Sequence, residues 1–289
     1  MTFVHKSAGL VRGGKILSVL LAFLLLTGTA CAPRAVPADA PTQLPAAPAS
    51  GATLTVLAAA SLTDSFNEIG KLFEAAHPGV KVAFNYAGSQ QLAQQLSQGA
   101  PADVFASASP KYMTAAVTAK RVNQDTPKTF ARNKLTVIYP AANPAGLKTL
   151  QDLARPGVKL VLGDQSVPAG QYSLTFLDNV DKDKSFDPAY KDNVLKNVVS
   201  YEDNVKSVLT KVELGEADAG IVYTTDAAAE TAGKIAQIPI PDALNVIAVY
   251  PIAPISDSTN PALAKAFVDL VLSPQGQAVM AKYGFIPPG

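Results

Sequence analysis

The sequence predicts an α/β protein with two lobes, each a sheet flanked by helices, and two strands that cross between the lobes. From Thr53 onward, short apolar runs typical of buried strands alternate with segments whose apolar residues recur at helical spacing. This alternation favours parallel sheets covered by helices. The about 240 residues after position 51 are enough for two ordinary domains, with one large sheet as the alternative.

The first 31 residues have the pattern of an export signal. Three basic residues precede an apolar run at 16–26, which is shorter than the about 20 residues that a membrane span needs. The only cysteine of the chain, Cys31, follows directly and suits lipid attachment to a membrane. The small residues Gly28, Thr29 and Ala30 also fit ordinary signal-peptidase cleavage, so both routes of processing stay open.

Residues 32–51 predict a tether rather than a folded segment. They contain five prolines and seven alanines and show no core-forming pattern. In an extended, polyproline-like state such a segment would reach roughly 60 Å. A spacer of this kind supports the lipid anchor at Cys31.

The first half of the chain after the tether is predicted to form three strands that alternate with three helices. Leu62, Phe66, Ile69 and Phe73 share one helical face, and Pro78-Gly79 ends that helix. We expect strands at 53–58, 80–84 and 103–106, and helices over about 62–76, over 90–98 and from Ser109-Pro110 onward.

The second half continues the pattern. We expect strands at 135–139, 158–162, 219–223 and 235–240, helices beginning near Thr149, Gly170, Asn204 and Thr225, an extended segment at 245–255, and closing helices that open at Asn260-Pro261 and Ser273-Pro274. The segments 135–139 and 246–250 are the candidates for crossing between lobes. Lobe 1 would then comprise 52–134 plus 248–289, and lobe 2 would comprise 135–247.

Small hydrogen-bond donors gather where helices are expected to begin. Three junctions between a strand and a helix carry Ser, Ala or Gly, at 58–64, 86–89 and 167–170. A helix N-terminus offers unpaired N–H groups and a partial positive charge, and small residues let an anion approach them. Taken alone, each serine is more often a plain helix cap. If the fold brings the three junctions together, they form an oxyanion site without Lys or Arg.

Several function classes lose their usual residues. The chain has two histidines and one cysteine, which disfavours ordinary zinc or copper sites and a Ser-His triad. It has no G-x-S-x-G, P-loop or G-x-G-x-x-G motif. After residue 31 the net charge is −2, and Trp is absent, so nucleic acid is a poor partner. We therefore expect a binding protein rather than an enzyme, with no cofactor.

Seven segments recur in a known family and in the same order. They are AAASLTD, GSQQLAQQ, GAPADVFASAS, GDQSVPAGQY, EDNV, GIVYTTDA and the terminal KYGF. Through them the chain resembles the periplasmic molybdate-binding proteins of ABC uptake systems from about Thr53 to Phe285. The resemblance implies a two-lobed periplasmic-binding-protein fold of type II, an inner-membrane ABC permease with its ATPase as partner, and a monomer.

In that family two serine hydroxyls, a few backbone amides and one tyrosine hydroxyl hold the oxyanion between the lobes. By motif position the resemblance implies Ser61, Ser89, Ala169, Val205 and Tyr223, with molybdenum held only as its oxyanion. Ser61 and Ser89 would belong to lobe 1 and the other three residues to lobe 2. The register around EDNV leaves Asn204 as an alternative to Val205.

The cargo follows from the donor chemistry. A tetrahedral dianion presents only acceptors, so a shell of neutral donors suits it, whereas hydrogen phosphate would press its own O–H against those donors. We expect molybdate and, at nearly the same size, tungstate. Sulfate or another oxyanion, carboxylate coordination through Glu202 or Asp203, and a sensor module on the same fold are the alternatives.

Overall fold

The computed structural model describes residues 51–228 and 233–289. The predicted export signal, Cys31 and the tether up to residue 50 lie outside the described residues. Within the described ranges, none of the helices is both long and apolar enough to cross a membrane.

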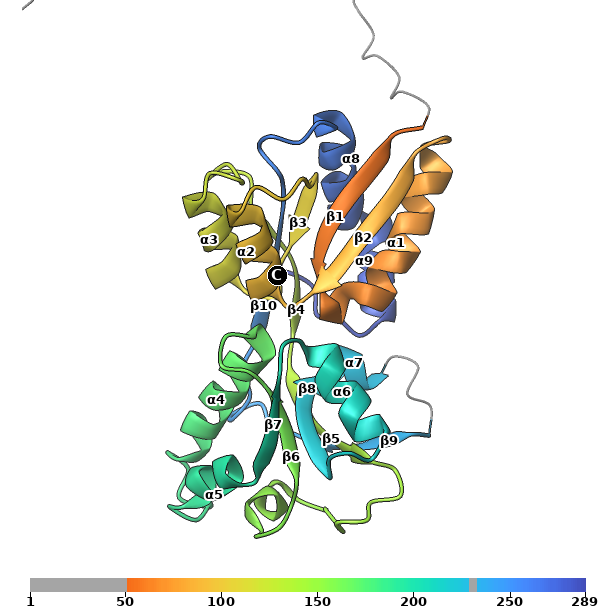
Figure 1. Ribbon diagram of the computed structural model, residues 1–289. Coiled ribbons are helices and arrows are strands. Elements are labelled where there is room, and N and C mark those ends of the chain that lie inside the picture. The colour runs from red at the N-terminus through yellow and green to blue at the C-terminus, as the bar shows by residue number, and fades with distance from the viewer. Residues whose placement is uncertain (1–50, 229–232) are drawn as a thin grey trace, which may run out of the picture. The chain divides into compact units, whose positions relative to one another are not determined.

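One five-stranded sheet has the strand order β2-β1-β3-β10-β4 (Figure 1). Its strands are β1 (Thr53–Ala59), β2 (Lys81–Ala87), β3 (Val104–Ala106), β4 (Lys128–Asn133) and β10 (Ala248–Pro254). β1 runs parallel to β2 and β3, whereas β10 runs antiparallel to β3 and β4. The half of the molecule built on this sheet is called lobe 1 below.

Helices cover both faces of the lobe 1 sheet. They are η1 (Ala60–Leu62), α1 (Thr63–Ala76), α2 (Ser89–Ser97), α3 (Pro110–Thr118), α8 (Pro261–Leu272) and α9 (Pro274–Lys282). Successive residues of β1 point to opposite faces, so Val56 packs in the core cluster that contains Phe66 of α1, and Leu57 packs in the cluster that contains Leu92 of α2.

A second five-stranded sheet has the order β7-β6-β8-β5-β9, and its half is called lobe 2. Its strands are β5 (Leu135–Pro140), β6 (Leu160–Gly163), β7 (Val198–Glu202), β8 (Ala219–Tyr223) and β9 (Ile235–Pro239). Its helices are η2 (Leu150–Ala154), α4 (Pro168–Val180), α5 (Tyr190–Lys196), α6 (Val205–Glu213) and α7 (Thr224–Ala228).

Both sheets are mixed, whereas the alternation of strands and helices favoured parallel sheets. β5 is antiparallel to β8 and β9, just as β10 is antiparallel to its neighbours in lobe 1. Parallel neighbours need a helical crossover on the same sheet. β5 and β10 instead enter their sheets directly from the other lobe, and each runs against its neighbours.

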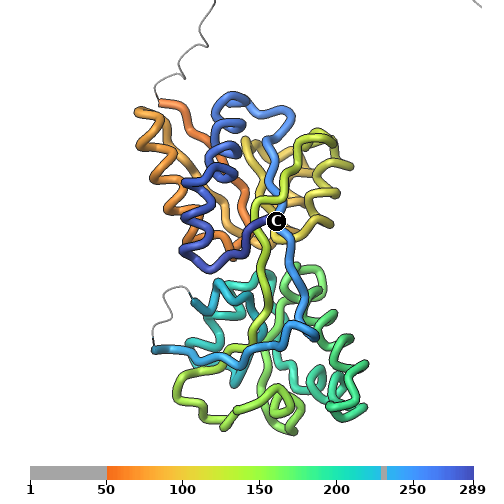
Figure 2. Tube along the Cα trace, turned by 180° about the vertical axis from the view of Figure 1, so that it is seen from behind, coloured from red at the N-terminus to blue at the C-terminus, as the bar shows by residue number. Residues whose placement is uncertain are grey.

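The first crossing lies beside the segment 135–139 that the sequence suggested, and the second overlaps the start of the segment 246–250. The segment 135–139 falls in β5, wholly within the lobe 2 sheet, and the chain crosses at Lys134 between β4 and β5. The return crossing ends where β10 begins at Ala248 (Figure 2). Asn245 ties the two crossings together, because its amide accepts from Leu135 N–H at 3.0 Å and donates to Leu135 C=O at 2.8 Å.

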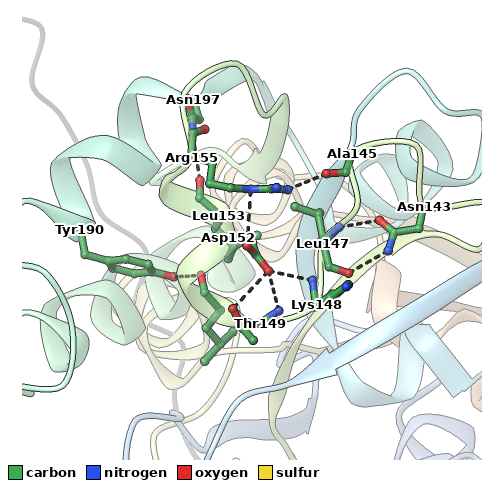
Figure 3. A network of polar contacts seen from close by, with 11 residues as sticks. Asn143, Ala145, Leu147, Lys148, Thr149, Asp152, Leu153, Arg155, Tyr190 and Asn197 are labelled. Atoms are coloured by element: carbon green, nitrogen blue, oxygen red, sulfur yellow. Dashed lines mark hydrogen bonds and ion pairs between the residues drawn. The ribbon is translucent and has the colours of Figure 1, made fainter.

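A polar network stabilises lobe 2 away from the crossings (Figure 3). One carboxylate oxygen of Asp152 accepts from the N–H groups of Lys148 and Thr149, both at 2.8 Å, and these hydrogen bonds hold its pKa below the ordinary range. Tyr190 donates its hydroxyl to the carbonyl of Leu150 at 2.7 Å. These contacts fix the loop before η2 and do not involve the junctions singled out from the sequence.

Candidate functional site

All five residues that the sequence singled out line one small cavity. The cavity is small, because the centre of a water-sized sphere has about 10 Å³ of space in it, which is about what one water molecule needs. Its lining residues are Ala59, Ala60, Ser61, Ala87, Gly88, Ser89, Ala108, Val167, Pro168, Ala169, Asn204, Val205 and Tyr223. Residues of both sheets and their helices contribute, so the cavity lies between lobe 1 and lobe 2. None of these described lining side chains is charged.

Helix beginnings surround the cavity. Ser61 is the second residue of η1 and Ser89 the first of α2, both in lobe 1. Ala169 is the second residue of α4 and Val205 the first of α6, both in lobe 2. The N–H groups of first-turn residues have no acceptor within their own helix, so all four can serve as donors toward the cavity.

The two serine side chains of lobe 1 are buried and already engaged with protein groups. Ser61 Oγ lies 3.0 Å from the hydroxyl of Tyr250. Ser89 Oγ accepts the N–H of Ala108 at 3.0 Å. Because that bond uses a lone pair of Ser89, the hydroxyl proton of Ser89 stays free to donate to a ligand.

Tyr223, at the end of β8, differs from the serines. Its side chain is 1 % exposed, and its hydroxyl has no hydrogen-bond partner among the described residues. Burial raises its pKa well above the ordinary value, so the phenol stays protonated and acts as a donor. A buried polar group without a partner is costly, and an acceptor in the cavity would satisfy it.

The region 202–205 bears on two alternatives that the sequence left open, namely whether the Asn204 or the Val205 amide is the donor and whether a carboxylate reaches the site. Asn204 and Val205 both line the cavity, but the side chain of Asn204 caps α6 by accepting the N–H of Ser207 at 3.0 Å. Glu202 pairs with Lys211 at 2.6 Å, and Asp203 accepts from Gln91 at 3.0 Å. Neither carboxylate lines the cavity, so carboxylate coordination of a metal has no support here.

Three charged side chains behind the cavity were not anticipated from the sequence. Lys206 of α6 lies 2.9 Å from Asp64 of α1 and 3.6 Å from Asp226 of α7, and therefore links the two lobes. Burial raises the pKa of Asp226 to about 6, although Lys206 favours its ionised form. Burial disfavours the charge on Lys206, but Asp226 and Asp64 outweigh it and raise the pKa of Lys206 above the ordinary value.

Polar contacts across the cleft hold the lobes together near Ser89. Gln90 donates to the carbonyl of Asp203 at 2.6 Å, and the hydroxyl of Tyr112 donates to the carbonyl of Ser166. Gly88 lies so close to lobe 2 that a β-carbon on it would sit 2.4 Å from the carbonyl oxygen of Asp203. The closed arrangement thus depends on the absence of a side chain at this position.

Residues 54–286 match the model of the bacterial extracellular solute-binding proteins. The chain is also 37 % identical, over its full length and that of the relative, to the molybdate-binding protein ModA of Mycobacterium tuberculosis. The chain belongs to the ModA family of bacterial extracellular solute-binding proteins. Membership in this family makes it an exported protein, and the family is one of binding proteins rather than enzymes.

Other relatives agree with this assignment. The molybdate-binding protein ModA of Escherichia coli is 34 % identical over 80 % of this chain and 88 % of its own length. The solved substrate-binding domain of a putative molybdenum ABC transporter from Clostridium difficile is 32 % identical, with a TM-score of 0.60 over 82 % of this chain and 99 % of that domain. The sulfate-binding protein SubI of Mycobacterium tuberculosis, at 21 % identity and a TM-score of 0.72 over 82 % of this chain and 87 % of SubI, shares the fold.

Proposed function

We propose that this protein captures molybdate, and tungstate with it, between its two lobes and delivers the oxyanion to an ABC permease. The ligand is held by the hydroxyls of Ser61, Ser89 and Tyr223 and by backbone amides that include those of Ser61, Ser89, Ala169 and Val205. The protein binds and releases its cargo without chemical change, and molybdenum enters and leaves as the oxyanion.

The observation that carries this proposal is the buried, unpartnered hydroxyl of Tyr223 in a cavity lined by neutral donors. Helix N-termini supply the positive potential, so the anion needs no Lys or Arg in contact. A dianion without a proton of its own can accept a hydrogen bond from every donor that the cavity presents, and it needs no acceptor from the protein. Relatives named as molybdate-binding proteins, aligned over the whole chain, favour molybdate among such dianions.

The two-lobed architecture supports capture by closure. We propose residues 52–134 plus 248–289 as lobe 1 and 135–247 as lobe 2, which places the serines in the first and Ala169, Val205 and Tyr223 in the second. An anion that contacts both lobes stabilises the closed state relative to an open one.

We also propose that the protein is exported and anchored to a membrane by a lipid. The signal at 1–31 directs the chain across the membrane, Cys31 receives a lipid, and residues 32–51 tether the body to that anchor. A relative in Bacillus subtilis, 32 % identical over 93 % of this chain, is named as a substrate-binding lipoprotein. One chain closes its own site, so we propose a monomer.

Calorimetric titration of the chain from Ala32 onward tests the cargo. We expect tight one-to-one binding of molybdate and tungstate and little heat from sulfate or phosphate. Tight binding of sulfate with weak binding of molybdate would keep the site and change the cargo. No measurable binding of any of the four anions would overturn the proposal.

A further inference from the structure

Tyr250 stands directly behind the proposed oxyanion site without lining it. It belongs to β10, the strand that re-enters lobe 1 from lobe 2, at the point where the pairing of β10 with β4 shifts register. Its side chain is fully buried. Its hydroxyl is 3.0 Å from Ser61 Oγ, and Tyr250 is absent from the residues that line the cavity. It therefore acts on a ligand through residues that line the cavity, and its hydroxyl is hydrogen-bonded to one of them, Ser61.

Aromatic neighbours hold the ring of Tyr250 in place. Phe130 of β4 packs edge-on at 6.2 Å between ring centroids, and Phe285 packs edge-on at 5.5 Å. Tyr223 contacts the ring at 5.8 Å. Tyr250 thus touches one proposed ligand residue from each lobe, and its orientation is fixed by rings from β4 and the C-terminal segment.

The direction of the Ser61–Tyr250 hydrogen bond follows from the chemistry of the ligand. An oxyanion only accepts hydrogen bonds, and Ser61 has a single hydroxyl proton to donate. If Ser61 gave that proton to Tyr250, it would turn oxygen lone pairs toward the anion. With the hydrogen bond between them kept, Ser61 can donate to the anion only when its own oxygen accepts the proton of Tyr250.

We propose that Tyr250 is a positioning residue for oxyanion binding, which donates its hydroxyl proton to Ser61 and so aims the Ser61 proton at the ligand. This inference rests on the proposed function of the cavity. Burial keeps the phenol protonated, because it raises the pKa of Tyr250 far above its ordinary value. Tyr250 is thereby a constant donor, and it sets the polarity of Ser61 before the ligand arrives.

The test is a double-mutant cycle with Tyr250→Phe and Ser61→Ala, read by calorimetric titration with molybdate. Phenylalanine keeps the ring contacts and removes only the hydroxyl. We expect Tyr250→Phe to weaken binding about five- to ten-fold when Ser61 is present. In the Ser61→Ala background the same change should have a much smaller effect, because the hydrogen bond to Ser61 is the route by which we propose that the Tyr250 hydroxyl acts on the ligand.

Tyr190→Phe is the matched control. Tyr190 is another buried tyrosine with one hydrogen bond, 2.7 Å to the Leu150 carbonyl, and it is remote from the cavity. Melting midpoints of the ligand-free proteins separate lost stability from lost positioning. We expect both Tyr→Phe variants to lower the midpoint, and only Tyr250→Phe to change the affinity.

Two results would overturn the positioning role while the wild-type protein still binds molybdate. One is an unchanged affinity of Tyr250→Phe. The other is an equal loss of affinity with and without the Ser61 hydroxyl, which would mean that Tyr250 acts through Tyr223 or through packing and not through Ser61. Absence of oxyanion binding by the wild-type protein would instead overturn the proposed function, and the inference with it.

Discussion

The two lobes prepare their donors for the ligand in different ways. In lobe 1 each proposed serine ligand already has a protein partner, Tyr250 for Ser61 and the Ala108 N–H for Ser89. In lobe 2 the phenol of Tyr223 is buried with no hydrogen-bond partner among the described residues. The serines of lobe 1 are thus held in place by protein groups, whereas the lobe 2 phenol lacks a partner that the proposed anion would supply. Capture by lobe 1 followed by closure of lobe 2 is the order that this difference favours.

The largest expected effect comes from preventing the two lobes from meeting. In Gly88→Ala the new β-carbon would lie 2.4 Å from the Asp203 carbonyl oxygen, so the cleft cannot close fully. We expect molybdate affinity to fall about 100-fold, since incomplete closure would cost the anion one or more hydrogen bonds from lobe 2, each worth about 1.5–3 kcal/mol. Calorimetric titration measures the loss, and an unchanged affinity would show that closure to this distance is not required. The backbone of Gly88 has φ −60°, so alanine suits the conformation and the fold should be kept.

Removal of the lobe 2 phenol should weaken binding while sparing stability. Tyr223→Phe deletes a donor to a charged ligand, and we expect a loss of about 10- to 100-fold in affinity. The ligand-free protein should melt at the same temperature or higher, because an unsatisfied buried hydroxyl is removed. A clear drop in that melting temperature would mean that the phenol is used within the protein itself.

Ser89→Ala tests the prediction that the donors of lobe 1, unlike the phenol of lobe 2, are held by protein groups. It removes a proposed donor to the ligand and also the acceptor for the buried Ala108 N–H. We expect a loss of about ten-fold in affinity together with a loss of about 1–3 kcal/mol in the free energy of unfolding of the ligand-free protein. Calorimetric titration measures the loss in affinity, and chemical denaturation measures the loss in the free energy of unfolding. Equal effects of Ser89→Ala and Tyr223→Phe on the free energy of unfolding would contradict the difference between the two lobes, in which only the serine has a partner in the protein.

A smaller effect is expected from the ion pair that joins the lobes. Lys206→Met removes the contact with Asp64 across the cleft, and we expect affinity to fall about five-fold, with the difference shrinking at high salt. Lys211→Met is the matched control on the same helix, because Lys211 pairs with Glu202 within lobe 2. Equal losses in the two variants would argue against a role of Lys206 in closure.

Asp226→Asn should have the smallest effect on affinity, and it should change how the free energy of unfolding depends on pH. Its pKa is about 6 in the folded protein and near 3.8 when unfolded, so the folded state binds more protons between these values. The contribution of Asp226 to stability is therefore full below about pH 4 and is lost as the pH rises through 6. Relative to Asp226→Asn, the wild-type free energy of unfolding should fall by up to about 3 kcal/mol from pH 4 to 7. A difference between the two proteins that does not vary with pH would contradict this assignment.

Elements with a strong local pattern were predictable, and elements that depend on their neighbours were not. The strand 219–223 matches β8 residue for residue, because its apolar run is buried on both faces. β4, with the sequence KTFARN, and β7, with VVSYE, were not foreseen. Both are edge strands, where exposed positions admit polar and charged residues and the apolar signal weakens.

The candidate site shows the same division. Ser61, Ser89, Ala169 and Val205 were accessible to sequence reasoning because small residues at the start of a helix are a local signal. Tyr250 and Lys206 could not be predicted, since a tyrosine in a strand and a lysine in a helix have no local sequence signal that distinguishes them. Only their partners give them a role, and those partners lie 189 residues away for Tyr250 and 142 for Lys206.

The sequence by itself determined the alternation of strands and helices and the family, and it predicted the candidate donors, because each of these depends on short segments of the chain. The tertiary structure decided that the sheets are mixed, where the chain crosses between lobes and which donors have partners of their own. Those properties depend on segments far apart in the sequence meeting in space. Ser89 and Tyr223 look alike as isolated hydroxyls, and only packing makes one pre-oriented and leaves the other for the ligand.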